Sequence, residues 1–214
     1  GSLFLSDKDT SHISKTKIIN NGLEKTFWFR GQNYSKLSGF TFKKRDSGGE
    51  GHLLIDGSRG FTLENCVFEG VGNLRIYESD SVNISKSKFI KMNNQDGGGI
   101  YSYSSDTLTV VNCLFDSTSA TRKGAYIYVH QSVGLKVINS TMVNGSGGYG
   151  GVFFYHSPGG EIINSIMKQS IYSIYAAGNS NPKHNISVKY SWFDTSSDSY
   201  YMNENSAYTI SENQ

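Results

Sequence analysis

The chain has 214 residues, of which 36% are hydrophobic and 18% are charged, and its formal net charge is +2. This charge is too small to suggest a nucleic-acid-binding protein, and no apolar run approaches the roughly 18 to 20 residues that a membrane span needs. Twenty-four glycines against two prolines, together with many Ser and Asn, predict strands and turns with little helix.

The first two residues, Gly1 and Ser2, are typical of a remnant left by cloning. No obvious capping helix follows them, so we expect the chain to be a fragment of a larger protein. Within it we predict one elongated domain over residues 1–214, with residues 195–214 as a C-terminal cap. Adjoining domains or subunits are expected at the open ends of such a domain.

One short pattern recurs along the chain: aliphatic, polar, aliphatic, polar, Asn, small, any residue, large apolar. Its copies lie at residues 61–68, 82–89, 108–115, 135–142, 160–167 and 186–193, after weaker copies at 13–19 and 37–42. The hydrophobic period within each copy is two rather than 3.6, which predicts strands.

The last apolar residue of each copy marks the length of the repeat. These residues are Phe42, Phe68, Phe89, Phe115, Met142, Met167 and Phe193. They are 21 to 27 residues apart, which is the length of one β-helical coil. We therefore predict an all-β fold, a single-stranded right-handed parallel β-helix of about seven or eight coils.

Two registers near the end of each copy hold small polar residues. The first contains Asn65, Asn112, Asn139 and Asn164. We expect an asparagine ladder there, whose side chains satisfy the amides of a turn. The next register contains two cysteines among serines: Cys66, Ser87, Cys113, Ser140, Ser165 and Ser191. Because one coil separates the cysteines, about 9 to 10 Å lies between them, and we predict buried free thiols rather than a disulfide.

A second strand follows the repeat and a glycine-containing loop, most clearly at residues 97–103, 124–129 and 150–155. Aligning these segments places Ile100, Ala125 and Val152 inward. Strand alternation then predicts two neighbouring outward columns, Tyr101, Tyr126 and Phe153 in one and Tyr103, Tyr128 and Tyr155 in the other. Arg75 and Tyr77 are expected to extend the columns at one end, and Tyr175 extends one column at the other end.

Stacked aromatic residues can stabilise a parallel sheet without any ligand, and this interpretation remains open. A large exposed aromatic patch, however, usually has a partner, and sugar rings stack on such faces while their hydroxyls reach phenols, Arg75, His130 or His156. The loops 93–99, 117–123 and 144–150 would form a wall along one side. We therefore take the aromatic columns, with Arg75 and His130, as the candidate ligand-binding residues.

The glycine–aromatic and Asn–small–x–apolar segments resemble the repeats of a known family. They are Gly97–Tyr101, Asn112–Phe115, Gly124–Tyr126, Asn139–Met142 and Gly150–Phe154. The resemblance is to pectin-lyase-like right-handed β-helices, above all to surface passengers of the polymorphic outer-membrane-protein type, and it covers residues from about 36 to 193. It implies an exported adhesive protein that is extracellular or displayed at the cell surface.

Enzymes of the pectin-lyase-like superfamily provide the main alternative. Pectate lyases need a carboxylate cluster for calcium, whereas the acids here lie mainly at predicted turns. The Asp-Asp pair, the Gly-His-Gly and the Arg-x-Lys of polygalacturonase-like hydrolases are missing, and the five histidines include no pair at metal-ligand spacing, so we expect neither a metal nor a cofactor. Glu161, or His130 with Asp106, remain candidates for an acid–base pair assembled from different coils.

Three functions therefore remain in view. The first is a binding or adhesion module for a polysaccharide or cell-surface glycan, or for a surface protein of a host or of the same organism. The second is a polysaccharide lyase or glycoside hydrolase. The third is a structural stalk or tailspike segment.

Overall fold

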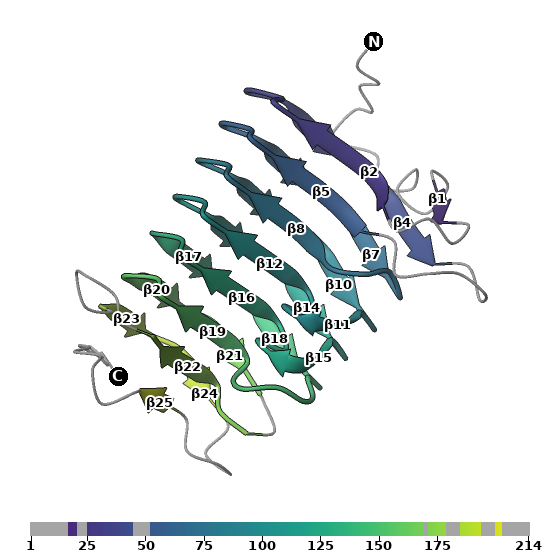
Figure 1. Ribbon diagram of the computed structural model, residues 1–214. Coiled ribbons are helices and arrows are strands. Elements are labelled where there is room, and N and C mark those ends of the chain that lie inside the picture. The colour runs from purple at the N-terminus through teal and green to yellow at the C-terminus, as the bar shows by residue number, and fades with distance from the viewer. Residues whose placement is uncertain are drawn as a thin grey trace.

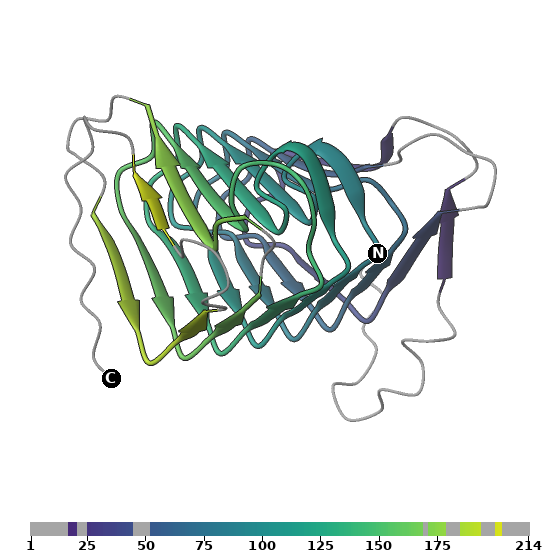
Figure 2. The same ribbon diagram turned by 90° about the horizontal axis from the view of Figure 1, so that it is seen from below.

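The computed structural model describes residues 17–20, 25–44, 52–168, 171–178, 185–193 and 200–202. These residues form short strands and no helix, and every strand pairing among them is parallel. Each coil contributes one strand to each of three long sheets, and the coils stack in chain order (Figures 1 and 2). The predicted parallel β-helix is confirmed.

We number the three long sheets in the order in which a coil passes through them. Sheet 1 contains β2 (Lys25–Arg30), β5 (His52–Asp56), β8 (Leu74–Tyr77), β12 (Ile100–Tyr103), β16 (Ile127–His130), β19 (Val152–Tyr155), β22 (Ile174–Ala177) and β25 (Tyr200–Met202). Sheet 2 contains β3 (Lys36–Ser38), β6 (Thr62–Glu64), β9 (Asn83–Ser85), β13 (Thr109–Val111), β17 (Leu135–Ile138), β20 (Gly160–Ile163) and β23 (Ile186–Lys189).

Sheet 3 contains β1 (Lys17–Asn20), β4 (Thr41–Lys44), β7 (Val67–Glu69), β10 (Lys88–Ile90), β14 (Leu114–Asp116), β18 (Thr141–Val143), β21 (Ile166–Met167) and β24 (Trp192–Phe193). A further pair, β11 (Asn93–Asp96) and β15 (Ser119–Lys123), forms a small sheet of its own. From the first to the last strand of sheet 2 the chain makes six complete turns, slightly fewer than the seven or eight coils expected.

The core contains the apolar residue that ends each repeat. Neighbouring strands of sheet 3 pair Phe42 with Phe68, and the same register continues coil by coil to Phe193. The rings of Phe68 and Phe89 stack with centroids 5.1 Å apart, and those of Phe89 and Phe115 are 4.6 Å apart. This column confirms the repeat boundaries, because a slip of one residue would have turned each side chain to the opposite face of the sheet.

The asparagine column lies at the corner between sheets 2 and 3, but its role differs from the one expected. Its members have left-handed backbone, with φ between 47° and 54° at Asn65, Asn112, Asn139 and Asn164. Asn tolerates this conformation better than most residues. Only one contact of the expected ladder is observed, from Asn164 Nδ2 to Asn139 Oδ1 at 2.8 Å.

The following register carries the hydrogen bonds that we had assigned to asparagine. The backbone N–H of Cys66, Cys113, Ser140 and Ser165 donates at 3.1 Å to the Oγ of the serine in the next coil. Asparagine is thus selected here for its backbone conformation, while inward serines satisfy the buried amides. Cys66 and Cys113 are buried free cysteines, as predicted.

A second serine column lies at the corner between sheets 1 and 2. It consists of Ser58, Ser79, Ser105, Ser132 and Ser157. After the first member, the hydroxyl of each serine accepts a hydrogen bond from the backbone N–H of the serine in the preceding coil. All five are buried. Two hydrogen-bonded columns therefore run inside the solenoid, one at each of these corners.

The ends of the chain are only partly described. Gly1, Ser2 and most of the predicted C-terminal cap, residues 195–214, lie outside the described residues. Within that cap, β25 pairs with β22 and so adds a strand to sheet 1. The assignment of residues 1–214 to one domain stays a prediction.

Candidate ligand-binding face

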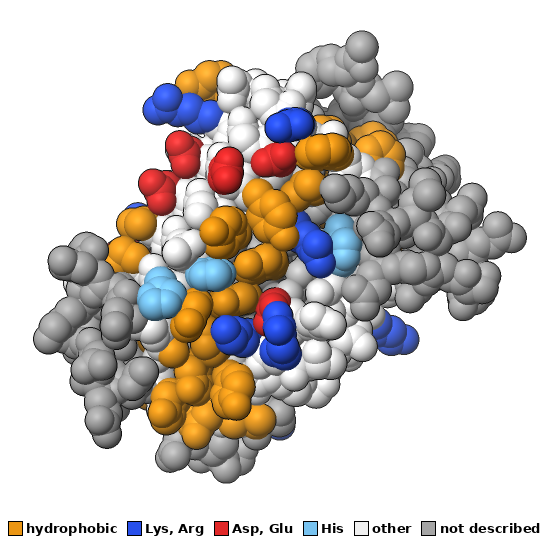
Figure 3. Space-filling view, in the orientation of Figure 1, with side chains coloured by type: hydrophobic (Ala, Val, Ile, Leu, Met, Phe, Trp, Pro, Cys, Tyr) orange, Lys and Arg blue, Asp and Glu red, His pale blue; other side chains and the backbone are white. Residues whose placement is uncertain are grey.

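The outward positions of sheet 1 form a strip of mainly aromatic side chains. In the first column β8, β12, β16, β19 and β22 place Arg75, Tyr101, Tyr128, Phe153 and Tyr175 in register. In the second column the first four of these strands place Tyr77, Tyr103, His130 and Tyr155 in register. We call these nine residues the aromatic face; Figure 3 shows a hydrophobic stripe across this side of the molecule, with histidine and basic side chains beside it.

The predicted alignment of one coil was wrong by two residues. Ile127, not Ala125, is the register partner of Ile100, so Tyr128 lies in the first column and His130 lies in the second. Gly97 and Gly124 both have left-handed backbone, with φ of 63° and 65°, and they are the glycines that correspond. The sequence alignment had matched Gly99 with Gly124 instead.

Tyr126 consequently lies in the core and not on the aromatic face. Its side chain is fully buried, and its hydroxyl accepts a hydrogen bond from Gly145 N at 3.0 Å and donates one to Lys168 O. Gly151 leaves room for the ring, because a Cβ there would lie 3.0 Å from Tyr126 Cδ2. Burial also raises the pKa of the Tyr126 phenol. Tyr126 is therefore a structural residue, and the prediction that it points outward is wrong.

The rings of the aromatic face contact one another along both columns. Tyr101 and Tyr128 stack with centroids 5.0 Å apart, and Phe153 and Tyr175 stack at 4.8 Å. In the second column His130 meets Tyr155 edge to face, with centroids 5.1 Å apart. Such contacts stabilise parallel strands, so part of the aromatic pattern has a structural role.

Exposure along the aromatic face is uneven. Tyr128 is only 3% exposed and Phe153 only 2%, although both occupy outward positions. The ammonium of Lys123 covers them, with Nζ 5.5 Å from each ring centroid and 4.2 Å from that of Tyr155. The expected ladder of exposed rings is therefore interrupted, because Tyr128 and Phe153 at its centre are covered. The rings that stay half-exposed are those of Tyr77, Tyr101, Tyr103, Tyr155 and Tyr175.

The covering lysine comes from the loop segments that precede the strands of sheet 1. β11 and β15 pair in parallel, and bridges from Ser119 to Ser146 and from Lys123 to Tyr149 continue the alignment into the next coil. At the end of β15, Arg122 forms an ion pair with Asp96 of β11. The loops thus place two cations and one carboxylate beside the aromatic face.

One polar contact marks the middle of this face. Tyr101 Oη lies 3.4 Å from His130 Nδ1, within hydrogen-bonding distance. Burial, with the positive charges of Lys123 and His156, lowers the pKa of His130, so this imidazole is neutral at pH 7. Burial also raises the pKa of Tyr101 to about 12, with smaller contributions from Tyr77 and Asp96.

At the N-terminal end of the face, Arg75 is fixed by a neighbouring amide. Its Nε donates to Asn73 Oδ1 at 3.0 Å, and Asn73 Nδ2 donates to the Asp96 carbonyl at 2.7 Å. This chain of contacts leads from Arg75 to the same Asp96 that binds Arg122. It fixes the guanidinium beside Tyr101, where a ligand on the face would meet it.

The two other acid–base candidates lie elsewhere. Glu161 belongs to β20 in sheet 2, where it pairs with Lys136 at 3.1 Å. Asp106 is exposed beyond the end of β12, and its neighbour in the next coil is Val133. Among the described residues, no three His, Cys, Asp or Glu side chains gather into a group that could hold a metal ion.

A comparison with known protein families agrees with the fold. The family model described as a right-handed β-helix region matches residues 1–142. No curated protein matches the sequence. Among solved structures, the A-module of the mannuronan C-5 epimerase AlgE4 from Azotobacter vinelandii is similar at 10% identity and a TM-score of 0.33, over 91% of this chain and 83% of that one. A likeness at this level carries no functional information.

The narrower resemblance to polymorphic outer-membrane-protein passengers stays a prediction. In the part of the chain that the structure describes, no helix is long and apolar enough to cross a membrane.

Proposed function

We propose that the chain, which belongs to the family of right-handed β-helix regions, is a binding module. It recognises a glycan through the aromatic face, whose residues repeat from coil to coil. We place it outside the cell, secreted or displayed at the surface, where a glycan chain is available as an adhesive target. A surface protein and an adjoining subunit, the other partners expected from the sequence, are left if the protein binds no glycan.

One observation carries the proposal: β8, β12, β19 and β22 each present half-exposed phenol rings, which are flanked by cations and a neutral imidazole. Tyr77, Tyr101 and Tyr103 form one group of rings, with Arg75 at its edge. Sugar rings present apolar CH faces that stack on phenols, and their hydroxyls accept from guanidinium and donate to imidazole. Structural stacking alone would not require the charged groups beside the rings.

The test is binding of the full chain to a panel of immobilised polysaccharides, repeated with the Tyr101→Ala/Tyr103→Ala double variant. Loss of two stacking platforms should weaken binding by about tenfold to a hundredfold. Tyr34→Ala is the matched control, since Tyr34 is an exposed tyrosine, 79% accessible, outside the aromatic face. Circular dichroism checks that each variant keeps the fold.

Equal binding by the double variant and wild type would place recognition elsewhere. Failure of the wild type to bind any polysaccharide would overturn the proposal and leave the stalk or protein-adhesion functions.

A second candidate function is cleavage by a polysaccharide lyase, which one specific arrangement favours. Neutral His130, the Tyr101 hydroxyl and the ammonium of Lys123 lie together at the centre of the face. A lyase needs a base for the proton beside a carboxylate and a cation that stabilises the resulting negative charge. A glycoside hydrolase instead needs two carboxyl groups, and the outward positions of β8 to β22 hold none.

This candidate is tested by the ultraviolet absorbance of the unsaturated product on any glycan that binds. Lyase activity predicts a signal that His130→Ala abolishes while binding persists. Binding without any absorbance change, over a long incubation, would reject it.

A further inference from the structure

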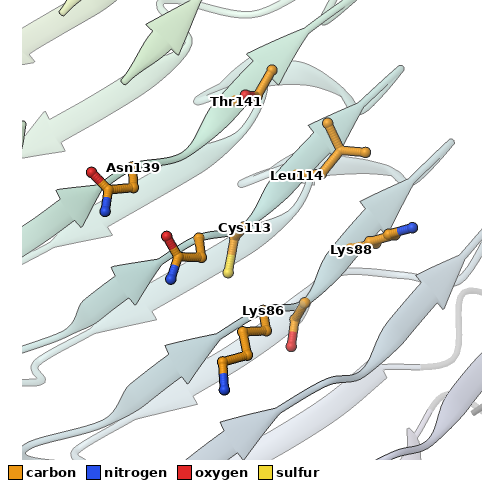
Figure 4. Close-up of a pocket in the computed structure, with 8 residues that line it drawn as sticks. Lys86, Lys88, Cys113, Leu114, Asn139 and Thr141 are labelled. Atoms are coloured by element: carbon orange, nitrogen blue, oxygen red, sulfur yellow. The ribbon is translucent and has the colours of Figure 1, made fainter. Parts of the chain in front are cut away.

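A groove runs along the corner between sheets 2 and 3, away from the aromatic face. Two hollows, with volumes of about 300 and 240 Å³, share Asn139 and Thr141 in their linings and so form one continuous depression. The first extends to Lys86 and Lys88, and the second extends to Trp192. We call this depression the corner groove; Figure 4 shows its first part, with labelled side chains contributed by successive coils.

The groove follows from the backbone of the repeat. At each corner one residue with left-handed φ turns the chain, and the next residue points into the core as a serine or cysteine. The outside of the corner therefore carries only the side chain of the turning residue, which leaves a hollow beside the next strand. Stacked over β10, β14, β18, β21 and β24, the hollow is about 19 Å long at about 4.8 Å per coil.

The lining changes in character along this length. Amides of Asn112, Asn139 and Asn164 recur at the turning position through the middle. At the C-terminal end Tyr190 is 64% exposed and Trp192 is 55% exposed, which are among the largest exposures of any aromatic side chain in the described residues. At the other end Lys88 makes no ion pair with a described residue, whereas Lys86 pairs with Glu64 at 2.8 Å.

We propose that the corner groove is a second saccharide-binding site, which takes an extended oligosaccharide along the axis of the solenoid. The exposed indole and phenol would stack on sugar rings, and the amides would bind sugar hydroxyls as both donors and acceptors. A site of this kind goes beyond the aromatic face and does not depend on it.

The geometry disfavours an extended peptide in the same groove. A peptide strand gains most of its affinity by adding to a free sheet edge. The groove instead crosses the strands, and from β10 to β21 their backbone groups are already paired with the coils on both sides. It therefore offers side chains alone, at a regular spacing, which suits a polymer whose own groups repeat along its length.

Tryptophan fluorescence provides a direct test, because the chain contains only two tryptophans. In a Trp28→Phe background Trp192 is the single indole. We would titrate this protein with oligosaccharides prepared from cellulose, chitin, xylan, polygalacturonate and alginate. A saturable change in Trp192 emission with one of them is the expected result.

Three variants in the same background locate the site. Asn139→Gly/Asn164→Gly removes two amides while glycine keeps the left-handed backbone, and it should weaken the saturable binding about tenfold or more. Asn65→Gly is the matched control, since Asn65 holds the same corner position, with φ of 52°, in a coil outside the groove. Tyr101→Ala/Tyr103→Ala tests independence from the aromatic face. Both of these should bind as the background does.

Two outcomes would overturn the proposal. One is the absence of a saturable Trp192 signal with every oligosaccharide in the set. The other is a signal that survives the double asparagine variant but is lost in the double tyrosine variant, which would assign the binding to the aromatic face alone. The two proposals can fail separately. A saturable Trp192 signal can occur when the tyrosine variant shows no role for the aromatic face in binding, and the aromatic face can bind a glycan when Trp192 gives no signal.

Discussion

The backbone N–H of Ser140 donates to Ser165 Oγ at 3.1 Å, and Ser165 Oγ in turn donates to the carbonyl of Ile163 at 2.9 Å. Both serines are buried, with exposures of 1% and 2%. One hydroxyl thus satisfies a buried donor in the preceding coil and a buried acceptor in its own. The arrangement joins successive coils at a point where the strand ladder is interrupted by the corner.

Removal of this hydroxyl should destabilise the protein. We expect Ser165→Ala to lower the free energy of unfolding by about 1 to 3 kcal/mol, because the Ser140 amide loses its partner in a buried site. The measurement is a urea unfolding curve followed by circular dichroism. Ser104→Ala is the control, since Ser104 is an exposed serine. Equal stability of the two variants would show that water replaces the lost partner.

Part of this architecture could be predicted from sequence and part of it was missed for a physical reason. The core column from Phe42 to Phe193 could be predicted because a large apolar residue that recurs once in every coil has few explanations other than a core position. The second serine column has the same signal, since Ser79, Ser105, Ser132 and Ser157 follow one another at intervals of 26, 27 and 25 residues. Serine is also common in loops, so its periodicity stands out less against the rest of the sequence.

The misplacement of Tyr126 has a different origin. Strand alternation predicts which residues share a face, but it does not say where the strand begins after a loop of variable length. Here the loop contains β15, and the strand begins only at Ile127. For these two coils the identity of the left-handed glycine would have supplied the missing register, because Gly97 and Gly124 each lie three residues before the strand. Sequence alone does not distinguish Gly97 from Gly99.

Because Tyr126 is buried, we expect its hydroxyl to contribute to the free energy of unfolding. Tyr126→Phe should lower the free energy of unfolding by about 1 to 3 kcal/mol, because the Gly145 amide loses its acceptor. Tyr103→Phe, at a half-exposed ring of the aromatic face, should change it by less than about 0.5 kcal/mol. Thermal or urea unfolding of the two variants side by side decides the matter, and equal effects would contradict the assignment of Tyr126 to the core.

The two cysteines should be inert in the folded protein. Burial raises the pKa of both Cys66 and Cys113 to about 11, so at pH 8 neither thiolate is appreciably populated or accessible. We expect no alkylation by iodoacetamide under native conditions and two alkylated sites in urea, as counted by mass spectrometry. A Ser104→Cys variant serves as the reactive reference, and native labelling of Cys66 or Cys113 at the same rate would refute their burial.

The last prediction concerns acid stability and rests on His52, at the start of β5. This side chain is buried, and burial, with a smaller contribution from the charge of Arg75, lowers its pKa from 6.5 to about 4. The neutral imidazole is therefore the form that the folded state accommodates. Between pH 6.5 and 4 the unfolded chain binds a proton that the folded protein does not, so the free energy of unfolding must fall as the pH falls through this window.

The full effect of such a shift is about 3 kcal/mol, lost between pH 6.5 and 4. His52→Gln should flatten this part of the stability profile, measured as urea midpoints at a series of pH values. Ser104→Ala, at an exposed serine, removes no titratable group and should leave the slope in place. If His52→Gln retains the wild-type slope, then the acid sensitivity does not arise at His52.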